Sequence, residues 1–106
     1  MTETELLYAI TSGSQKRPGL CAQLGIRWYH AHDSRRSVPG WPDLVLVGNS
    51  IIFRELKSAT GTLRPEQHDW RDVLCVAGAD WAIWRPADLE SGRIEAELCA
   101  LIRGRI

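Results

Sequence analysis

Apolar positions along the chain change repeatedly between helical and strand spacing, and this change predicts the order of the elements. A helix is expected from near residue 2 to Gly13, because Thr2 and Glu5 form a capping-box pattern before the apolar run LLYAI. A second, short helix should end at Gly25, since glycine suits the left-handed position after a helix. Residues 26–32 alternate in polarity and are rich in aromatic types, which predicts a strand.

Two apolar runs, residues 43–47 and 51–56, flank Gly48, Asn49 and Ser50, which predicts a β-hairpin. Pro65 suits the first position of the next helix, which Gly78 should close. The apolar stripe of that helix is predicted to be Trp70, Val73, Leu74 and Ala77. Residues 80–84 predict a further strand, and the final segment predicts one helix capped by Asp88, with the stripe Ile94, Leu98, Leu101 and Ile102.

The element order is helix, strand, strand, strand, helix, strand, helix, which predicts an α/β fold with a central mixed β-sheet flanked by helices. The strand at 80–84 should lie parallel to a central strand through a right-handed crossover. With 106 residues, the chain is expected to form a single domain over 1–106.

Composition narrows the partners that can be expected. No apolar run approaches the roughly 20 residues that span a bilayer, and the N-terminus lacks the pattern of a signal peptide, so we expect a cytoplasmic protein with no membrane partner. The formal net charge is zero, so bulk charge predicts no nucleic-acid partner, although residues 16–36 have a basic bias. The widely spaced Cys21, Cys75 and Cys99 predict buried apolar side chains rather than a disulfide framework.

Three charged residues interrupt the predicted hairpin. Side chains alternate along a strand, so Glu55 and Lys57 should point to the same face. Closure of the hairpin at Gly48 and Asn49 would bring Asp43 alongside Glu55, since both are similarly distant from the turn. Taken singly, Asp43 can be a strand-entry residue, and Glu55 and Lys57 can belong to an exposed cross-strand face.

Together, the three charges favour a metal site. Two close carboxylates repel each other, and a hard divalent cation with oxygen ligands relieves that repulsion. Mg²⁺ or Mn²⁺ fits an incomplete set of protein ligands, with Asp43, Glu55 and the backbone carbonyl of Leu56 as candidates. Lys57 beside the cation would orient or deprotonate an attacking water, or stabilise charge on a phosphorane-like transition state. The combination predicts hydrolysis of phosphodiesters.

The segment GWPDLVLVGNSIIFRELKSATGTLRPEQHDW resembles the VRR-NUC (virus-type replication-repair nuclease) domain of the PD-(D/E)XK nuclease superfamily. The motifs that carry the resemblance are G-x-P-D, E-x-K, G-x-L and a downstream glutamine, and it is tightest over residues 38–86. It implies a restriction-endonuclease-like core. It also implies a metal-dependent nuclease in which Asp43 and Glu55 hold Mg²⁺ or Mn²⁺, Lys57 assists the water and Gln67 supports the site from its helix.

Several neighbouring residues have more than one interpretation. Gln67, third in its helix, can cap the backbone or serve the site. The acidic residue that the family carries in its first helix can be Glu3 or Glu5, and Glu3 is favoured because Glu5 is already explained by the cap. Arg35 and Arg36 precede the catalytic strand and are candidate phosphate contacts, and Arg64 is a candidate DNA contact.

The expected function is therefore that of a metal-dependent, structure-specific endodeoxyribonuclease without a small-molecule cofactor. Stand-alone members of this size resemble phage-encoded nucleases, which act as homodimers on branched DNA such as Holliday junctions in replication, repair or recombination. A phage-encoded protein would work in the cytoplasm of the host cell. The alternative is a non-catalytic DNA-binding module on the same fold.

Overall fold

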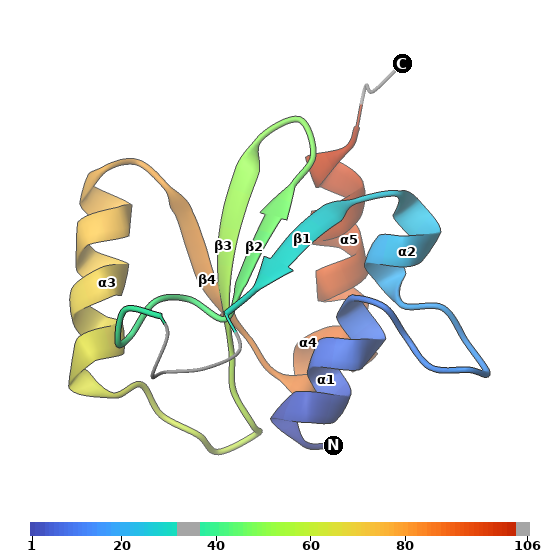
Figure 1. Cartoon of the computed structure of the whole chain (residues 1–106), viewed down its shortest axis with the longest axis horizontal. Helices are drawn as coiled ribbons and strands as arrows, with labels where there is room; N and C mark the ends of the chain where they lie inside the picture. The colour runs from blue at the N-terminus through green and yellow to red at the C-terminus, as the bar shows by residue number, and fades with distance from the viewer. Residues whose placement is uncertain (32–36, 104–106) are drawn as a thin grey trace.

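The protein is described here by a computed structural model that covers residues 1–31 and 37–103. Its centre is a four-stranded mixed sheet with the strand order β1-β2-β3-β4 (Figure 1). β1 (Arg27–His30), β2 (Leu44–Val47) and β3 (Ile51–Leu56) are antiparallel neighbours, and β4 (Asp80–Trp84) is parallel to β3. The predicted hairpin, the mixed sheet and the parallel last strand are confirmed.

Five helices accompany the sheet within the described residues: α1 (Glu3–Ile10), α2 (Leu20–Leu24), α3 (Pro65–Val76), α4 (Pro86–Glu90) and α5 (Arg93–Leu101). The predicted capping box starts α1, because Thr2 Oγ1 accepts a hydrogen bond from the Glu5 N–H and Glu5 Oε1 accepts one from the Thr2 N–H. Gly25 ends α2 in the left-handed conformation, as predicted, with a φ of 70°.

The prediction of one final helix was wrong. Gly92 has a φ of 84° and separates α4 from α5, because this left-handed conformation cannot continue a helix. Asp88 does cap a helix, but from the first turn of α4, where its Oδ2 accepts a hydrogen bond from the Arg85 N–H at 2.8 Å. The predicted stripe is otherwise sound, since Ile94, Leu98 and Leu101 are buried.

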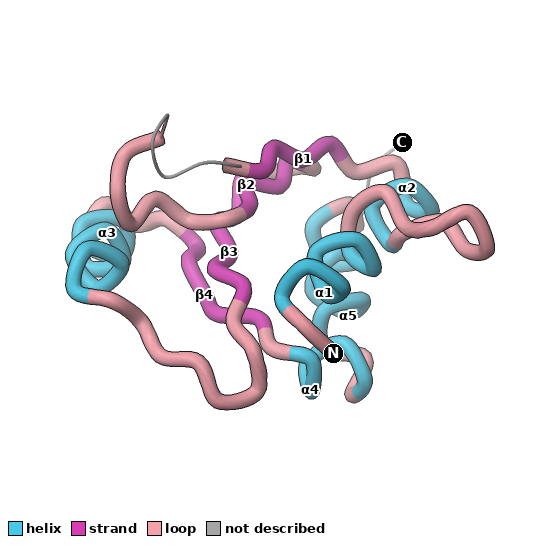
Figure 2. Tube along the Cα trace, turned by 60° about the horizontal axis from the view of Figure 1, so that its bottom comes forward, coloured by secondary structure: helices cyan, strands magenta, loops and turns pink. Residues whose placement is uncertain are grey.

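The main core lies on one face of the sheet. Figure 2 shows α1, α2 and α5 on that side and α3 alone on the other. The buried apolar side chains are Leu6, Ile10, Cys21, Ile26, Leu44, Leu46, Ile52, Leu56, Trp84, Ile94, Leu98 and Leu101. Cys21 joins this core as predicted, and its burial raises the pKa of its thiol to about 12. Cys99 is half-buried and Cys75 exposed, so the prediction of three buried cysteines was wrong.

Helix α3 contacts the sheet through a different stripe from the predicted one. Val73 is 59% exposed and Ala77 is also exposed, whereas Gln67 is buried and Trp70 and Leu74 are half-buried. One helix face contains Gln67, Trp70 and Leu74. This face is rotated from the predicted apolar stripe because it includes the buried side-chain amide of Gln67. No helix of the described residues is long and apolar enough to cross a membrane.

Candidate active site

The structure brings the carboxyl groups of Asp43 and Glu55 together. The last register pair of the hairpin is Leu44 and Arg54, so Asp43 and Glu55 stand opposite each other one step further from the turn. Asp43 Oδ2 accepts a hydrogen bond from the Leu56 N–H at 2.8 Å, which fixes the Asp43 side chain against β3. The sequence argument for this pair needed only strand alternation and the position of the turn.

Glu55 is the most unusual group of the site, because its side chain is only 2% exposed. Its Oε1 accepts a hydrogen bond from Gln67 Nε2 at 3.0 Å. Its Oε2 is buried and has no hydrogen-bond partner among the described residues. Burial first, and then the closeness of the Asp43 carboxyl group and its charge, raise the pKa of Glu55 to about 9, while the charge of Lys57 opposes the shift.

Lys57 is buried beside this pair, with 8% of its side chain exposed. Its backbone N–H donates to the Trp84 carbonyl at 3.1 Å, which continues the β3–β4 pairing past the end of β3. Within residues 1–31 and 37–103, no ion pair includes the Lys57 ammonium group. The Lys57 ammonium group therefore affects Glu55 through its charge alone, and its N–H donors remain able to bind another ligand.

Gln67 caps its helix, as one interpretation of its position predicted, and also contacts Glu55. Its Oε1 accepts a hydrogen bond from the Arg64 N–H at 2.8 Å, which caps α3, and its Nε2 holds Glu55. A single buried amide thus joins α3 to β3. Arg64 itself is exposed at the N-terminus of α3, so its guanidinium faces solvent near the site.

Gly40, the first residue of the G-x-P-D motif, lets this loop approach α3 closely. It has a φ of 84°, and an added Cβ would stand 2.3 Å from the Glu66 carbonyl oxygen. Beside it, Trp41 packs edge-on against Phe53, with ring centroids 5.8 Å apart, and against Trp70 at 5.0 Å. The Trp41 ring therefore joins α3 to the sheet.

The position of Pro42 bears on the Leu56 carbonyl. In an antiparallel pair, a residue directs its N–H and its C=O to the same neighbour, so the Leu56 carbonyl faces the side of Asp43. Continuing the register places Pro42 opposite Leu56, and proline has no N–H to donate. Pro42 therefore cannot donate a hydrogen bond to the Leu56 carbonyl.

The two acidic residues at the start of α1 differ in their surroundings. The Glu5 carboxylate accepts the Thr2 N–H, and this hydrogen bond lowers the pKa of Glu5. The charge of Glu3, in contrast, contributes to raising the pKa of Glu55. Of the two residues, Glu3 is thus the one whose field reaches the site.

These residues can supply only part of the ligand set of a divalent cation. The carboxyl groups of Asp43 and Glu55, which include the partnerless Glu55 Oε2, supply oxygen ligands of the kind that Mg²⁺ and Mn²⁺ prefer. However, no three His, Cys, Asp or Glu side chains converge at a metal-binding distance among the residues that the structure describes. Waters and a substrate phosphate would have to supply the remaining ligands.

The predicted loop contacts and a cavity of the described residues add nothing to the site. Arg35 and Arg36, the predicted phosphate contacts, lie outside the described residues. A cavity of about 590 Å³ lies between α1, α2 and the segment around Arg17; Glu5 lines it, but Asp43, Glu55, Lys57 and Gln67 do not. The proposed chemistry therefore rests on the carboxylate pair and not on a deep pocket.

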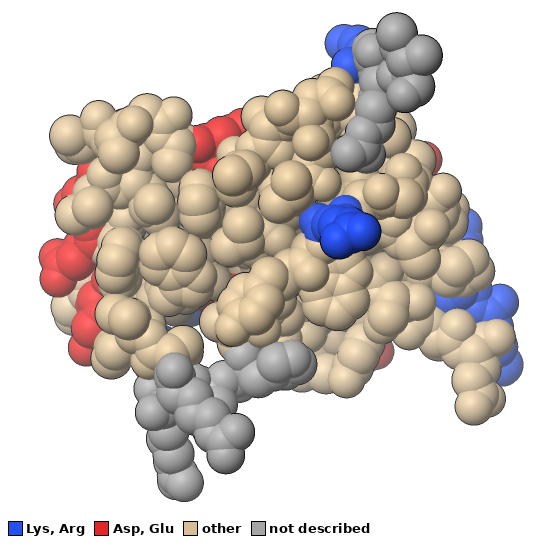
Figure 3. All heavy atoms as spheres, turned by 45° about the horizontal axis from the view of Figure 1, so that its top comes forward, with Lys and Arg blue, Asp and Glu red and all other residues tan. Residues whose placement is uncertain are grey.

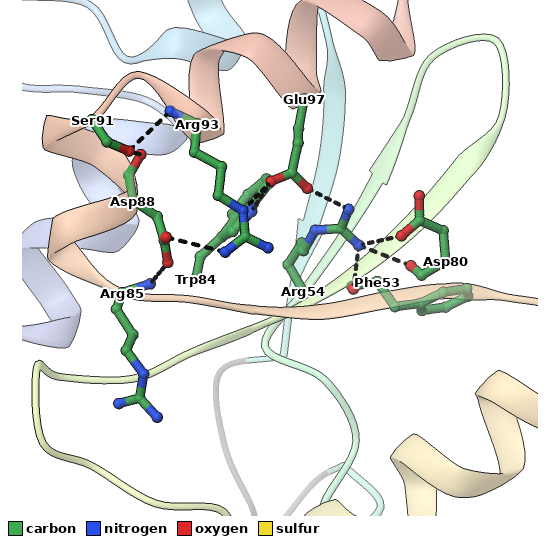
Figure 4. A network of polar contacts seen from close by, with 9 residues as sticks. All are labelled: Phe53, Arg54, Asp80, Trp84, Arg85, Asp88, Ser91, Arg93 and Glu97. Atoms are coloured by element: carbon green, nitrogen blue, oxygen red, sulfur yellow. Dashed lines mark hydrogen bonds and ion pairs between the residues drawn. The ribbon is translucent and has the colours of Figure 1, made fainter.

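A network of charged side chains behind β3 was missed by the sequence reasoning. Figure 4 shows Arg54, buried on the opposite face from Glu55, between Asp80 and Glu97. Its guanidinium donates to Glu97 Oε1 at 2.7 Å and to Asp80 Oδ1 at 3.0 Å, and it lies over the Trp84 ring. The sequence offered one signal: Arg54 shares its strand face with the apolar Ile52 and Leu56, and a buried arginine requires acidic partners.

No family model matches the chain, and no curated protein or solved structure matches it either. The α/β class with a four-stranded mixed sheet is thus established by the structure alone. The resemblance to the VRR-NUC family stays a prediction that rests on the motif residues.

Proposed function

We propose that the protein is a Mg²⁺- or Mn²⁺-dependent endodeoxyribonuclease of the VRR-NUC type, with a restriction-endonuclease-like PD-(D/E)XK core. The observation that carries the proposal is the pair of half-buried Asp43 and buried Glu55, in which Glu55 Oε2 has no partner within the described residues. A buried carboxylate is costly unless it is neutralised, and either a proton or a cation can do this. In a small domain, such a pair would lower the free energy of unfolding substantially without any functional gain.

Each residue has a role in the proposed reaction. Asp43, Glu55 and the Leu56 carbonyl would hold the cation, and Gln67 keeps Glu55 in place through its amide N–H. The bound cation would offset the carboxylate repulsion and polarise the scissile phosphate. Lys57 would orient the attacking water or stabilise the charge that grows on the phosphate oxygens.

The substrate, the oligomeric state and the location of the protein are part of the same proposal. Branched DNA, such as a Holliday junction, is the proposed substrate, with Arg64 and the undescribed Arg35 and Arg36 as phosphate contacts. Symmetric cutting of two strands requires two active sites, so we propose a homodimer that acts in the cytoplasm. Sedimentation with and without a junction substrate measures this assembly.

A cleavage panel tests the activity. The purified chain is incubated with a Holliday junction, a flap, a duplex and a single strand, each with Mg²⁺ and with Mn²⁺. We expect cleavage of branched DNA, reduced by about 100-fold or more in Asp43→Asn, Glu55→Gln and Lys57→Ala. The matched controls Glu95→Gln and Lys16→Ala change exposed residues of the same types and should retain activity.

The outcomes separate the two function classes. If all four DNAs stay intact with either cation while a junction is still bound, the chain is a DNA-binding module and the nuclease proposal is wrong. Cleavage that survives in Glu55→Gln and Lys57→Ala would keep the activity and refute the assigned residues.

A further inference from the structure

Arg85, at the end of β4, holds the segment that follows the catalytic strand. Its Nη1 donates to the Ser58 carbonyl and to the Gly61 carbonyl, both at 2.7 Å. The Gly61 N–H in turn donates to Ser58 Oγ at 3.0 Å, which closes the turn. One guanidinium nitrogen thus fixes both ends of residues 58–61.

This turn lies directly against the Lys57 side chain. A Cβ added to Gly61 would stand 3.5 Å from Lys57 Cδ, so the stem of the lysine runs alongside the Gly61 backbone. Lys57 is also anchored at its backbone, through the Trp84 carbonyl. The remaining freedom of the ammonium group is therefore limited by where residues 58–61 sit.

Arg85 is itself held from the other side. Asp88 Oδ2 accepts the Arg85 N–H, and Asp88 Oδ1 pairs with Arg93 at 3.1 Å. Arg93 continues to Glu97, which pairs with the buried Arg54 next to Glu55 in β3. Figure 4 shows this series of contacts, with the Arg85 guanidinium turned away from it. The backbone of Arg85 is therefore anchored to this series through Asp88, while its guanidinium donates to the turn at residues 58–61.

We infer that Arg85 is a positioning residue that confines Lys57 by holding residues 58–61 against its stem. The inference about Lys57 confinement stands on contacts alone, and its catalytic consequence rests on the proposed nuclease function. Arginine suits this task because its planar group presents several donors in a fixed geometry. Loss of these hydrogen bonds would leave two half-buried carbonyls without a donor and would release the turn.

Chemical labelling tests the confinement without any requirement for activity. Lys16, the other lysine of the chain, is exposed and serves as the internal reference. The folded protein is treated with an amine-selective reagent, and the modification rates are mapped by mass spectrometry. We expect Lys57 to react more slowly than Lys16 in the wild type, and its relative rate to rise roughly tenfold in Arg85→Ala through local opening.

Arg71→Ala is the matched control, because Arg71 pairs with Asp72 in α3 and donates to neither Ser58 nor Gly61. The relative rate of Lys57 should stay at the wild-type value in this variant. Thermal melts confirm that each variant is folded at the labelling temperature. An unchanged Lys57 rate in folded Arg85→Ala overturns the inference, whether or not the wild type cleaves DNA.

Cleavage kinetics then test the consequence. In Arg85→Ala, kcat should fall about tenfold or more while KM for the DNA changes little, because a displaced ammonium affects the reacting centre. Arg85→Lys, which can still donate to both carbonyls, should restore much of the rate. In the Lys57→Ala background, the Arg85→Ala change should cause no further fall in kcat. Additive losses would show that Arg85 acts independently of Lys57, and a wild type without cleavage would refute the nuclease proposal alone.

Discussion

At the scale of single residues, Glu55 gives the protein an unusual dependence on pH. The pKa of Glu55 is about 9 in the folded protein against an ordinary value of 4.5, so the folded state keeps a proton that the unfolded state releases in this window. Since the unfolded state binds fewer protons, the free energy of unfolding falls as pH rises from about 5 to about 9. The slope should be roughly 1 kcal/mol per pH unit when no divalent cation is present.

Glu55→Gln should remove this slope, because a neutral amide neither titrates nor repels Asp43. At pH 8 without divalent cations, this variant should therefore be more stable than the wild type. Urea unfolding at a series of pH values measures the difference. Glu95→Gln, an exposed change of the same type, should retain the wild-type slope. Equal slopes in Glu55→Gln and the wild type would show that Glu55 is already ionised in the folded protein.

The sequence could predict the carboxylate pair but not the state of its members. Strand alternation and the position of the turn are enough to bring Asp43 and Glu55 together. The partnerless Oε2 and the double role of Gln67 depend on how α3 packs against the sheet, which is a long-range property. Spacing along the chain carries no information about that contact.

At the scale of elements, α3 depends on a close backbone approach at Gly40. Gly40→Ala would combine a left-handed conformation with a Cβ 2.3 Å from the Glu66 carbonyl oxygen, so the loop and α3 must separate. We expect a loss of about 2–4 kcal/mol in the free energy of unfolding. Because Gln67 moves with α3, cation affinity should fall as well. Denaturant unfolding and Mn²⁺ titration measure the two effects.

Gly78→Ala is the matched control, since Gly78 has a φ of 86° but open space around its Cβ position. It should show only the conformational cost, about 1 kcal/mol, and no change in cation affinity. If the two variants lose the same free energy of unfolding, the close backbone approach at Gly40 makes no contribution of its own to stability.

The network behind β3 connects β3, β4 and α5 through Arg54. Glu97→Ala should cost about 3 kcal/mol, because it removes the shorter of the two ion pairs of a guanidinium that is only 3% exposed. Asp80→Ala should cost under about 1 kcal/mol, since the Asp80 side chain is 62% exposed and its backbone carbonyl still accepts from Arg54. Thermal unfolding of both variants checks the order, and equal losses would contradict it.

The element boundaries show which local signals were sufficient. Caps and turn residues, such as Thr2 with Glu5 and Gly25, act within a few positions and were interpreted correctly. The stripe of α3 and the division at Gly92 were not, because apolar spacing alone does not reveal which side of a helix meets the sheet. Val73 is apolar and yet exposed, while the polar Gln67 is buried.

At the scale of the whole molecule, zero net charge conceals an uneven surface. Acidic side chains gather along α3 in Figure 3, where the helix carries Glu66, Asp69 and Asp72. Glu66 stands two positions after Arg64, so a phosphate backbone that reaches Arg64 must pass close to this acidic side. The repulsion acts at long range and is screened by salt.

Neutralising Glu66 and Asp69 should therefore strengthen DNA binding. In Glu66→Gln with Asp69→Asn, we expect the affinity for a branched DNA to rise about three- to tenfold at low salt, mainly through faster association. The gain should shrink as salt is raised, because screening removes the repulsion in the wild type too. Fluorescence anisotropy without divalent cations measures binding in the absence of cleavage.

The control makes the same charge change elsewhere. Glu90→Gln with Glu95→Gln also removes two exposed acidic charges, but from α4 and α5. If this pair raises the affinity as much as the α3 pair, only the net charge of the protein matters and DNA does not approach along α3. If the α3 pair alone raises it, DNA passes the N-terminus of α3, where Arg64 and Gln67 stand beside the carboxylate pair. That path would deliver a phosphate to Asp43 and Glu55.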